Sequence, residues 1–280
     1  MPTRLFEIDL HVHAGNERYE ASIADFLAAL HARGVTLCGL LDHVELHLML
    51  DNWSRALRKQ LDERNLPYYR SGIGGLQDLY RDIDAAARPG GMRVLKGLEF
   101  NNTAATPDEA LALPDFLCFC FGDVSNRPGA TYGERAADQI RQVGRKILPS
   151  GKAGIINHPF RQRLWAYKDL CARHEAPPVA QFISEDDVRR MAEAAGEYDL
   201  ALEINLGDLF LLIGSTPEHA ALRALWLHAA GTLVASGASL SLGSDSHKLP
   251  GPFEPAILDL VAAIGLEVRH LERILNRLIS

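Results

Sequence analysis

The chain has 280 residues, of which 47% are apolar and 23% charged, so it can bury one large hydrophobic core. Its net charge of −7 at pH 7 argues against nonspecific nucleic-acid binding, which depends on clustered positive charge. No apolar run approaches the roughly 20 residues that span a bilayer. The four cysteines lack CxxC spacing and no signal-type segment opens the chain, so we expect a cytoplasmic protein with reduced thiols and no membrane partner.

Seven short apolar runs predict β-strands, and they alternate with segments of helical periodicity. The expected strands are Leu5–His13, Thr36–Asp42, Arg93–Phe100, Phe116–Phe121, Gly154–His158, Leu200–Leu206 and Ser239–Ser244. Such an alternation favours a parallel sheet wrapped by helices, and α/β barrels of this length are commonly single domains. We therefore expect one α/β domain over residues 1–280.

Helical spacing fills most of the intervals between these strands. The expected helices are Ile23–Ala32, Trp53–Arg64, Gln77–Ala87, Gly133–Ile147, Glu185–Ala195, Glu218–Ala230, Glu254–Ile264 and a closing amphipathic helix, Glu267–Ile279. A helical excursion at about residues 44–91 contains a glycine-rich turn, residues 71–75. This turn follows no strand and lacks a Gly-Lys-Ser/Thr sequence, which predicts a loop and not a phosphate cradle.

Residues with metal-binding chemistry stand at the ends of five of the expected strands. His11 and His13 are two positions apart on a strand, so both imidazoles face the same side. The other groups are Asp42-His43, Gly97-Leu98-Glu99, Asn157-His158-Pro159 and Gly243-Ser244-Asp245-Ser246-His247. Because the carboxyl ends of parallel strands converge on one face, these groups predict a metal centre there.

Neighbouring residues predict how this centre is supported. Asp9 shares the face of His11 and is expected to accept a hydrogen bond from a liganding imidazole. Pro159 disfavours a helical backbone at His158, which predicts an extended conformation for that histidine. Glu203 and Asn205 share one face of the sixth strand, and the sequence leaves open whether they contact substrate or brace the barrel.

Other conspicuous side chains have simpler interpretations. Cys118 and Cys120 share one face of the fourth strand; they could replace a lost ligand, but unpaired cysteines are usually buried, so core packing is favoured. The remaining histidines fall in helical or loop segments without ligand spacing, and we expect them on surfaces or helix faces. They are His31, His47, His174, His219, His228 and His270.

In their chain order, the five motifs resemble the PHP (polymerase and histidinol phosphatase) superfamily of metal-dependent phosphoesterases. The matching segments are Asp9-Leu10-His11-Val12-His13, Leu41-Asp42-His43, Gly97-Leu98-Glu99, Asn157-His158-Pro159 and Gly243-Ser244-Asp245-Ser246-His247. The resemblance implies an α/β fold, a distorted TIM-like (β/α)7 barrel, with one to three divalent metal ions at the carboxyl ends of its strands.

The resemblance also implies a ligand for each metal position. One metal would take His11, His13, Glu99 and Asp245, and Glu99 would bridge to a second metal that also takes His158. His43 and His247 would bind a third metal, with Asp42 supporting them.

Two departures from the family pattern leave the second and third sites with fewer ligands. The histidine that usually follows the HxH pair is missing, with Asn16 nearby. The histidine expected at the start of the fourth strand is replaced by phenylalanine.

Mixed nitrogen and oxygen ligation suits zinc, manganese or iron. The chemistry that the resemblance implies is attack of metal-bound hydroxide on a phosphate ester of a small metabolite or nucleotide. Glu99, Asp245 and His247 would then be catalytic, with either His247 or a metal-bound water protonating the leaving oxygen. Cationic side chains suit phosphate, and the candidates are Arg18, Arg161, Arg163 and Lys248.

Two alternatives remain open. Amidohydrolases, which cleave C–N or lactone bonds, also begin with HxH, although they often carry a carboxylated lysine where this chain has Glu99. A catalytically degenerate metal-binding domain is the second alternative, motivated by the missing ligands. Oligomeric state, metal number and substrate identity are not determined by the sequence.

Overall fold

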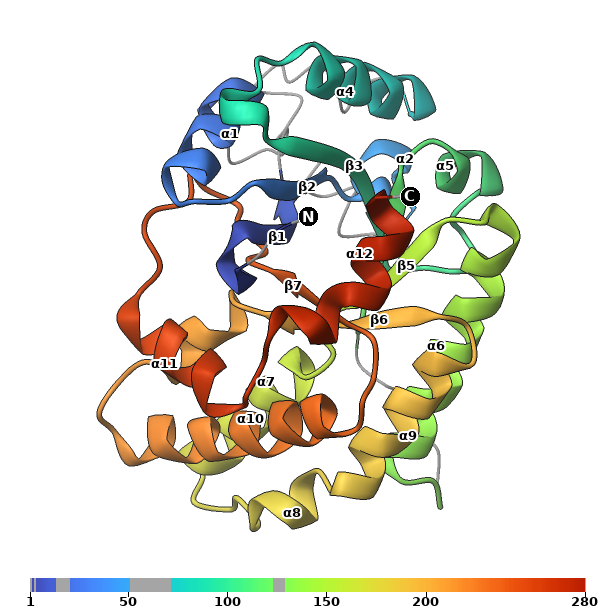
Figure 1. Ribbon diagram of the computed structural model, residues 1–280. Coiled ribbons are helices and arrows are strands. Elements are labelled where there is room, and N and C mark those ends of the chain that lie inside the picture. Colours follow the sequence, from blue (N-terminus) through green and yellow to red (C-terminus); the bar gives the residue numbers. More distant parts are fainter. Residues whose placement is uncertain (1, 3, 14–20, 51–71, 123–128, 280) are drawn as a thin grey trace.

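The computed structural model describes residues 2, 4–13, 21–50, 72–122 and 129–279. Seven parallel strands form one sheet in chain order, each paired with the next. The strands are β1 (Ile8–His13), β2 (Leu37–Leu41), β3 (Arg93–Phe100), β4 (Phe116–Cys120), β5 (Ala153–Asn157), β6 (Leu200–Asn205) and β7 (Leu240–Gly243). The result is the expected TIM-like α/β barrel, nearly closed and surrounded by helices (Figure 1).

The barrel closes between β1 and the segment that follows β7. The backbone N–H of His13 donates to the carbonyl of Ser246 at 3.0 Å, and the N–H of Asp245 donates to the carbonyl of His11 at 2.7 Å. These bonds join the first and last sequence motifs directly. Closure of the barrel and assembly of the motif residues therefore use the same backbone.

Helices connect successive strands around the barrel (Figure 1). The α-helices are α1 (Ile23–Ala32), α2 (Val44–Leu48), α4 (Ile73–Ala85), α5 (Asp108–Ala112), α6 (Tyr132–Ile147), α7 (Arg161–Ala172), α8 (Val179–Phe182), α9 (Glu185–Gly196), α10 (Pro217–Ala235), α11 (Pro255–Ala263) and α12 (Glu272–Ile279). Short 3-10 helices are η1 (Leu5–Glu7), η3 (Pro89–Gly91), η4 (Leu148–Ser150), η5 (Asp208–Leu212) and η6 (Val268–Leu271). Across the described residues, no helix combines the length and apolar character needed to cross a bilayer.

All seven expected strands are present, β3 with its expected bounds and the others with ends shifted by at most three residues. The largest shift is in β1, because its first expected residues form the 3-10 helix η1. The prediction of a loop over the glycine-rich turn is partly wrong, because residues 73–75 form the first turn of α4. The helix begins directly after Gly72, whose φ is 56°. The expected closing helix is divided into η6 and α12, and α7 was not expected. The expected helix Trp53–Arg64 lies outside the described residues.

The ring of Phe116 lies inside the barrel beneath the strand ends. Phe116 is fully buried, and a Cβ atom placed on Gly39 or Gly97 would lie 2.5 or 2.6 Å from its ring. Side chains two positions apart on a strand face the same side, so this ring lies one layer below Glu99. The two glycines thus make room for an apolar floor under the polar end of the barrel.

The carboxylate of Asp187 joins α9 to α6. It accepts hydrogen bonds from the Gly133 N–H at 2.7 Å, from the Ser184 N–H at 3.0 Å and from the Ser184 hydroxyl at 2.8 Å. Burial raises the pKa of this carboxyl, but these hydrogen bonds outweigh burial and hold the pKa below its usual 3.8.

We expect Asp187→Ala to lower the free energy of unfolding by about 2 kcal/mol, because it leaves the buried Gly133 N–H without its partner and removes half of a capping box. The folded state depresses the carboxyl pKa, so this stabilisation is complete above the unfolded-state pKa and is lost as pH falls through the folded-state value. Urea unfolding at neutral pH and below the carboxyl pKa measures both effects.

Asp186→Ala is the matched control for this measurement. Asp186 occupies the same first turn but forms a solvent-exposed ion pair with Arg190, and such pairs contribute about 0–1 kcal/mol. Equal destabilisation by the two substitutions at neutral pH would contradict the assigned role of Asp187.

Candidate metal centre

Four side chains from three parts of the chain converge at the carboxyl ends of the strands. The Nε2 atoms of His11 and His13 lie 3.0 Å apart. Oδ1 of Asp245 is 3.3 and 3.2 Å from these two nitrogens, and Oε2 of Glu99 is 3.8 and 3.2 Å from them. Four ligands bound tetrahedrally at about 2.0–2.1 Å would be separated by about 3.3 Å. The donor atoms of His11, His13 and Glu99 all lie within 4.8 Å of one another, and Asp245 contacts both imidazoles, which is the close spacing expected of metal ligands.

The charge at this cluster also fits a cation. Burial raises the pKa of Glu99, but the imidazoles of His43 and His11 outweigh it and hold that pKa well below its usual range. Burial lowers the pKa of His11, yet the carboxylates of Glu203, Asp245 and Glu99 raise it well above its usual value. Buried carboxylates thus stay ionised and attract positive charge, which is what a divalent ion supplies.

A second group of donors lies beside the first. His13, His43 and His247 each offer a ring nitrogen within 4.8 Å of the others. The ring of His13 stacks on those of His247 and His43, with centroid separations of 4.2 and 4.5 Å. Burial lowers the pKa of His43 to about 4, although Glu99 opposes this effect. The imidazole of His43 is therefore neutral, which is the form that binds metals.

A third group consists of Glu99, Cys120 and His158, whose ligand atoms also lie within 4.8 Å of one another. Nε2 of His158 is 3.6 Å from Oε1 of Glu99 and 3.7 Å from Sγ of Cys120. The favoured interpretation of the two β4 cysteines as core residues holds for Cys118, which is fully buried, but not for Cys120, which is partly exposed among these donors.

His158 does not have the extended backbone expected from Pro159. Its φ is 33°, in the left-handed region, and its N–H donates to Oε2 of Glu203 at 2.8 Å. A proline disfavours the right-handed helical region at the preceding residue but does not force extension when a buried hydrogen bond selects another conformation. The carboxylate of Glu203 therefore fixes the backbone of this candidate ligand.

Glu203, and not Asp9, orients the first imidazole. Oε1 of Glu203 is 2.8 Å from Nδ1 of His11, the nitrogen that faces away from the donor cluster. Asp9 instead accepts the backbone N–H of Ser244 at 2.8 Å and that of His11 at 3.4 Å. The expected imidazole contact of Asp9 is thus wrong, and Glu203, left open between two roles, braces the barrel and a candidate ligand.

Two further buried partners surround the cluster. The carboxylate of Asp42 accepts the N–H of His43 at 2.8 Å and lies 3.3 Å from Nε2 of His47. His47 is only 2% exposed, so of the two expected positions, a surface or a helix face, it takes the second, on the buried face of α2. Nδ2 of Asn157 donates to Oε1 of Glu99 at 2.9 Å. Asn157 is the residue before His158 at the end of β5, and this position in the sequence is the pattern that could have predicted its contact with Glu99.

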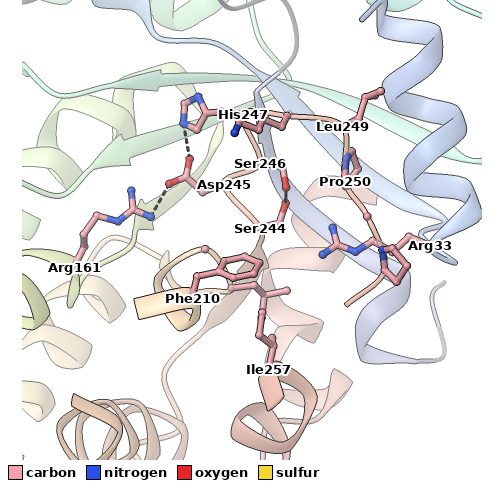
Figure 2. Close-up of a pocket in the computed structure, with 15 residues that line it drawn as sticks. Arg33, Arg161, Phe210, Ser244, Asp245, Ser246, His247, Leu249, Pro250 and Ile257 are labelled. Atoms are coloured by element: carbon pink, nitrogen blue, oxygen red, sulfur yellow. Dashed lines mark hydrogen bonds and ion pairs between the residues drawn. The ribbon is translucent and has the colours of Figure 1, made fainter. Parts of the chain in front are cut away.

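A cavity of about 400 Å³ opens beside Asp245 and His247. Arg161 lies on its wall, where Nη2 is 2.6 Å from Oδ2 of Asp245 (Figure 2). Its Nε is 2.5 Å from Oδ1 of Asp208. Lys248 also lines the cavity. One guanidinium is thus held at the edge of the donor cluster, facing the cavity.

The other cationic candidates differ from Arg161. The guanidinium of Arg163 packs over the rings of Phe182 and Tyr132, at 3.5 and 4.6 Å from their centroids, and donates to the carbonyl of Phe182. Its expected phosphate contact is not supported, because cation–π packing holds it on α8 and away from the cavity lining. Arg18 lies outside the described residues.

Comparison with known proteins found no family model that matches the chain. A probable phosphatase of Shewanella frigidimarina (strain NCIMB 400) is 27% identical over 283 residues, covering 97% of this chain and 89% of the relative. A probable phosphatase of Shewanella piezotolerans (strain WP3 / JCM 13877) is 25% identical over 281 residues, covering 97% and 90%.

One solved structure shares the fold over nearly the whole chain. It is histidinol phosphate phosphatase from Lactococcus lactis, complexed with zinc, L-histidinol and phosphate. The two chains are 14% identical with a TM-score of 0.52, and the match covers 92% of each. Taken with the curated relatives and the motif order, this likeness confirms the resemblance to PHP-type proteins and supports a metal-dependent hydrolase.

Because Gly243 has no side chain, His11 and Glu203 can contact each other beside it. A Cβ atom at this position would lie 2.2 Å from Oε1 of Glu203 and 2.3 Å from Cβ of His11. We expect Gly243→Ala to weaken metal binding by about 10- to 100-fold, the effect of disturbing a residue that orients a ligand. Metal content per chain after equilibration with buffered zinc measures this change.

Gly231→Ala is the control substitution, since no atom lies within 4 Å of a Cβ atom added in that helix. It should bind metal like the wild type. If Gly243→Ala also binds metal normally while remaining folded, the close packing of His11 on Glu203 does not govern metal affinity.

Proposed function

We propose, on the basis of the PHP resemblance, that the protein is a metal-dependent phosphoesterase that hydrolyses phosphate monoesters of a small metabolite or nucleotide. The observation that carries this proposal is the arrangement of His11, His13, Glu99 and Asp245. Their donor atoms have the close spacing expected of metal ligands, and one cavity wall joins Asp245 to a guanidinium. Metal ligands beside a fixed cation suit a tetrahedral anion such as phosphate.

The donor set fits divalent zinc, manganese or iron, with His11, His13, Glu99 and Asp245 as proposed ligands at the first position. His158 would contribute to a second position, which shares Glu99, and His43 and His247 would contribute to a third. When bound, a divalent ion supplies a Lewis acid that polarises the phosphoryl group and favours formation of a nucleophile from water near neutral pH. Asp9 accepts backbone N–H groups beside the first position, and Asp42 accepts the N–H of His43 beside the third.

The side chains of the protein position the substrate. Asp208 and Asn205 hold the guanidinium of Arg161, which directs it along the cavity wall toward Asp245. We assign it to bind the nonbridging oxygens of the phosphoryl group, where a planar guanidinium can donate two hydrogen bonds. Lys248 on the same cavity wall adds a second positive charge.

His247 is the proposed proton donor to the leaving oxygen when its imidazole does not bind metal, because one ring nitrogen cannot hold both a metal ion and a proton. Its imidazole is 29% exposed, lines the cavity, and lies 3.2 Å from Oδ1 of Asp245 through Nε2. Asp245 therefore contacts both the proposed proton donor and the proposed phosphate ligand. The proposed bond cleavage and phosphate binding would therefore use one connected group of side chains.

The dimensions of the cavity favour a small substrate. Its volume of about 400 Å³ is at the lower end of the range for small-molecule sites. Phe210 and Leu249 expose apolar surface on its walls (Figure 2), at 60% and 49% exposure. A phosphate on a compact, partly apolar metabolite would match both the cationic and the apolar walls. The L-histidinol and phosphate of the solved relative belong to this size class.

The amidohydrolase alternative gains no specific support from the described residues. Lys96, on the same strand as Glu99, forms an ion pair with Asp84 at 2.8 Å and does not join the donor clusters. A degenerate metal-binding domain would share the geometry but release no product. Activity measurements therefore distinguish these two alternatives from the proposed phosphoesterase.

Phosphate release from an aryl phosphate should require added zinc, manganese or iron, and His13→Ala should lower kcat/KM by at least about 1000-fold, because it removes a nitrogen common to two donor groups. His228→Ala is the control. The imidazole of His228, on α10, contacts the carbonyl of Ile183 just after α8 and lies outside the donor clusters. Absence of phosphate release with every metal, together with bound metal, would support the degenerate alternative.

Arg161→Lys should raise KM for the phosphate ester by about 10- to 100-fold, because a lysine cannot reproduce paired guanidinium hydrogen bonds worth roughly 1.5–3 kcal/mol. Arg163→Lys should leave KM near the wild-type value, since Arg163 packs on Phe182 and Tyr132. Steady-state kinetics at saturating metal test both substitutions. A larger KM effect at Arg163 than at Arg161 would reverse the assignment.

A further inference from the structure

Cys120 is the last residue of β4, and its side chain faces the donor clusters. β4 pairs with β5 so that Cys120 lies opposite Asn157, the residue before His158. Sγ of Cys120 and Nε2 of His158 are 3.7 Å apart, and a carboxylate oxygen of Glu99 lies within 4.8 Å of both. Sulfur, nitrogen and oxygen donors from three adjacent strands therefore meet at one point.

The spacing of these donors matches a zinc site. Bonds of about 2.3 Å to sulfur and about 2.0–2.1 Å to nitrogen at a tetrahedral angle place the two ligand atoms about 3.6 Å apart. The observed separation is 3.7 Å. The 3.6 Å between Nε2 of His158 and Oε1 of Glu99 is also close to the tetrahedral value for nitrogen and oxygen.

The environment of His158 holds its side chain toward this point. Its N–H is fixed by Glu203 at 2.8 Å, and its backbone adopts the left-handed φ of 33°. Glu99 is held in turn by Asn157, which donates to Oε1 at 2.9 Å. Two of the three donors are thus held in place by their own buried neighbours, as ligands of metal sites commonly are.

We propose that Sγ of Cys120, Nε2 of His158 and a carboxylate oxygen of Glu99 bind a zinc ion, and that Cys120, at the end of β4, supplies a third donor to this position although the histidine expected at the start of the strand is missing. The thiol loses its proton to solvent as the sulfur–zinc bond forms, and no group is oxidised or reduced. Burial alone raises the pKa of the Cys120 thiol, but a bound divalent ion deprotonates a coordinating thiol outright.

A thiolate also narrows the choice of metal at this position. Cysteine sulfur is a soft ligand that favours zinc, whereas manganese prefers oxygen donors. The first cluster, built from imidazoles and carboxylates, makes no such distinction. One metal position is thus selective for zinc, while its neighbour, which shares Glu99, accepts several metals.

Cobalt substitution tests this inference, because a thiolate bound to Co²⁺ gives an intense charge-transfer band in the near ultraviolet. The full-length protein, freed of metal by a chelator under reducing conditions, is titrated with Co²⁺. We expect the band in the wild type and in Cys171→Ser, a control cysteine of similar exposure outside the clusters. Cys120→Ser should abolish it, and Cys120→His should bind Co²⁺ without it.

Zinc binding gives a second measure of the same ligand. Cys120→Ser should lower the affinity for one equivalent of zinc by more than about 100-fold. Residues that merely orient a ligand have effects of at most about this size. A near-ultraviolet band that is absent from the wild type, or that persists in Cys120→Ser, overturns the inference.

Alkylation of the wild type keeps the test decisive if Cys120→Ser does not fold. Iodoacetamide modification is followed at each cysteine by peptide mass spectrometry, with and without zinc. Zinc should slow modification of Cys120 at least about 10-fold and leave Cys171 unchanged, a protection expected when the thiolate is engaged as a ligand. Equal protection of both cysteines, or of neither, contradicts metal ligation by Cys120.

The inference rests on the metal-dependent function proposed above, but the two can fail separately. A charge-transfer band without phosphate release would leave the cysteine ligand established and the phosphoesterase proposal wrong. Phosphate release without the band would retain the phosphoesterase and remove Cys120 from the metal site.

Discussion

The closure of the barrel between β1 and the segment after β7 is the constraint on which the rest of the structure depends. Two backbone hydrogen bonds, His13 to Ser246 and Asp245 to His11, join the ends of a sheet that spans most of the chain. They also bring together side chains more than 200 positions apart in the sequence. A barrel that closed in another register would displace Asp245 from both imidazoles, since a one-residue slip reverses the direction of every side chain.

This closure gathers buried charge that would otherwise oppose folding. Glu99, Glu203 and Asp245 lie within a few ångströms of one another's imidazole partners, above the apolar ring of Phe116. Buried charges are costly unless they are paired and hydrogen-bonded. Here each carboxylate contacts at least one imidazole, and Asn157 or Arg161 supplies further donors. Local stability is thus given up for a preorganised group of metal-binding donors.

The sequence predicts the architecture well because hydrophobic periodicity is a local signal. All seven strands are recovered, and the HxH pair, Glu99 and Asp245 meet as expected because the parallel topology brings strand ends together. Side-chain partnerships depend instead on three-dimensional register. Glu203 replaces Asp9 as the partner of His11, and the Pro159 rule fails at His158 because a buried carboxylate selects the backbone conformation. Likewise, nothing local distinguishes Arg161 from Arg163, which differ in the rings and carboxylates nearby.

The left-handed backbones of His158 and Asp245, with φ of 33° and 52°, bear on how the protein would respond to selection in the laboratory. Each non-glycine residue in this region costs about 1–2 kcal/mol. Replacement by glycine would relax the backbone and delete a polar side chain from a crowded anionic pocket. A screen that rewarded thermal stability alone would therefore favour variants that dismantle the centre, so libraries built on this barrel should hold these two positions fixed.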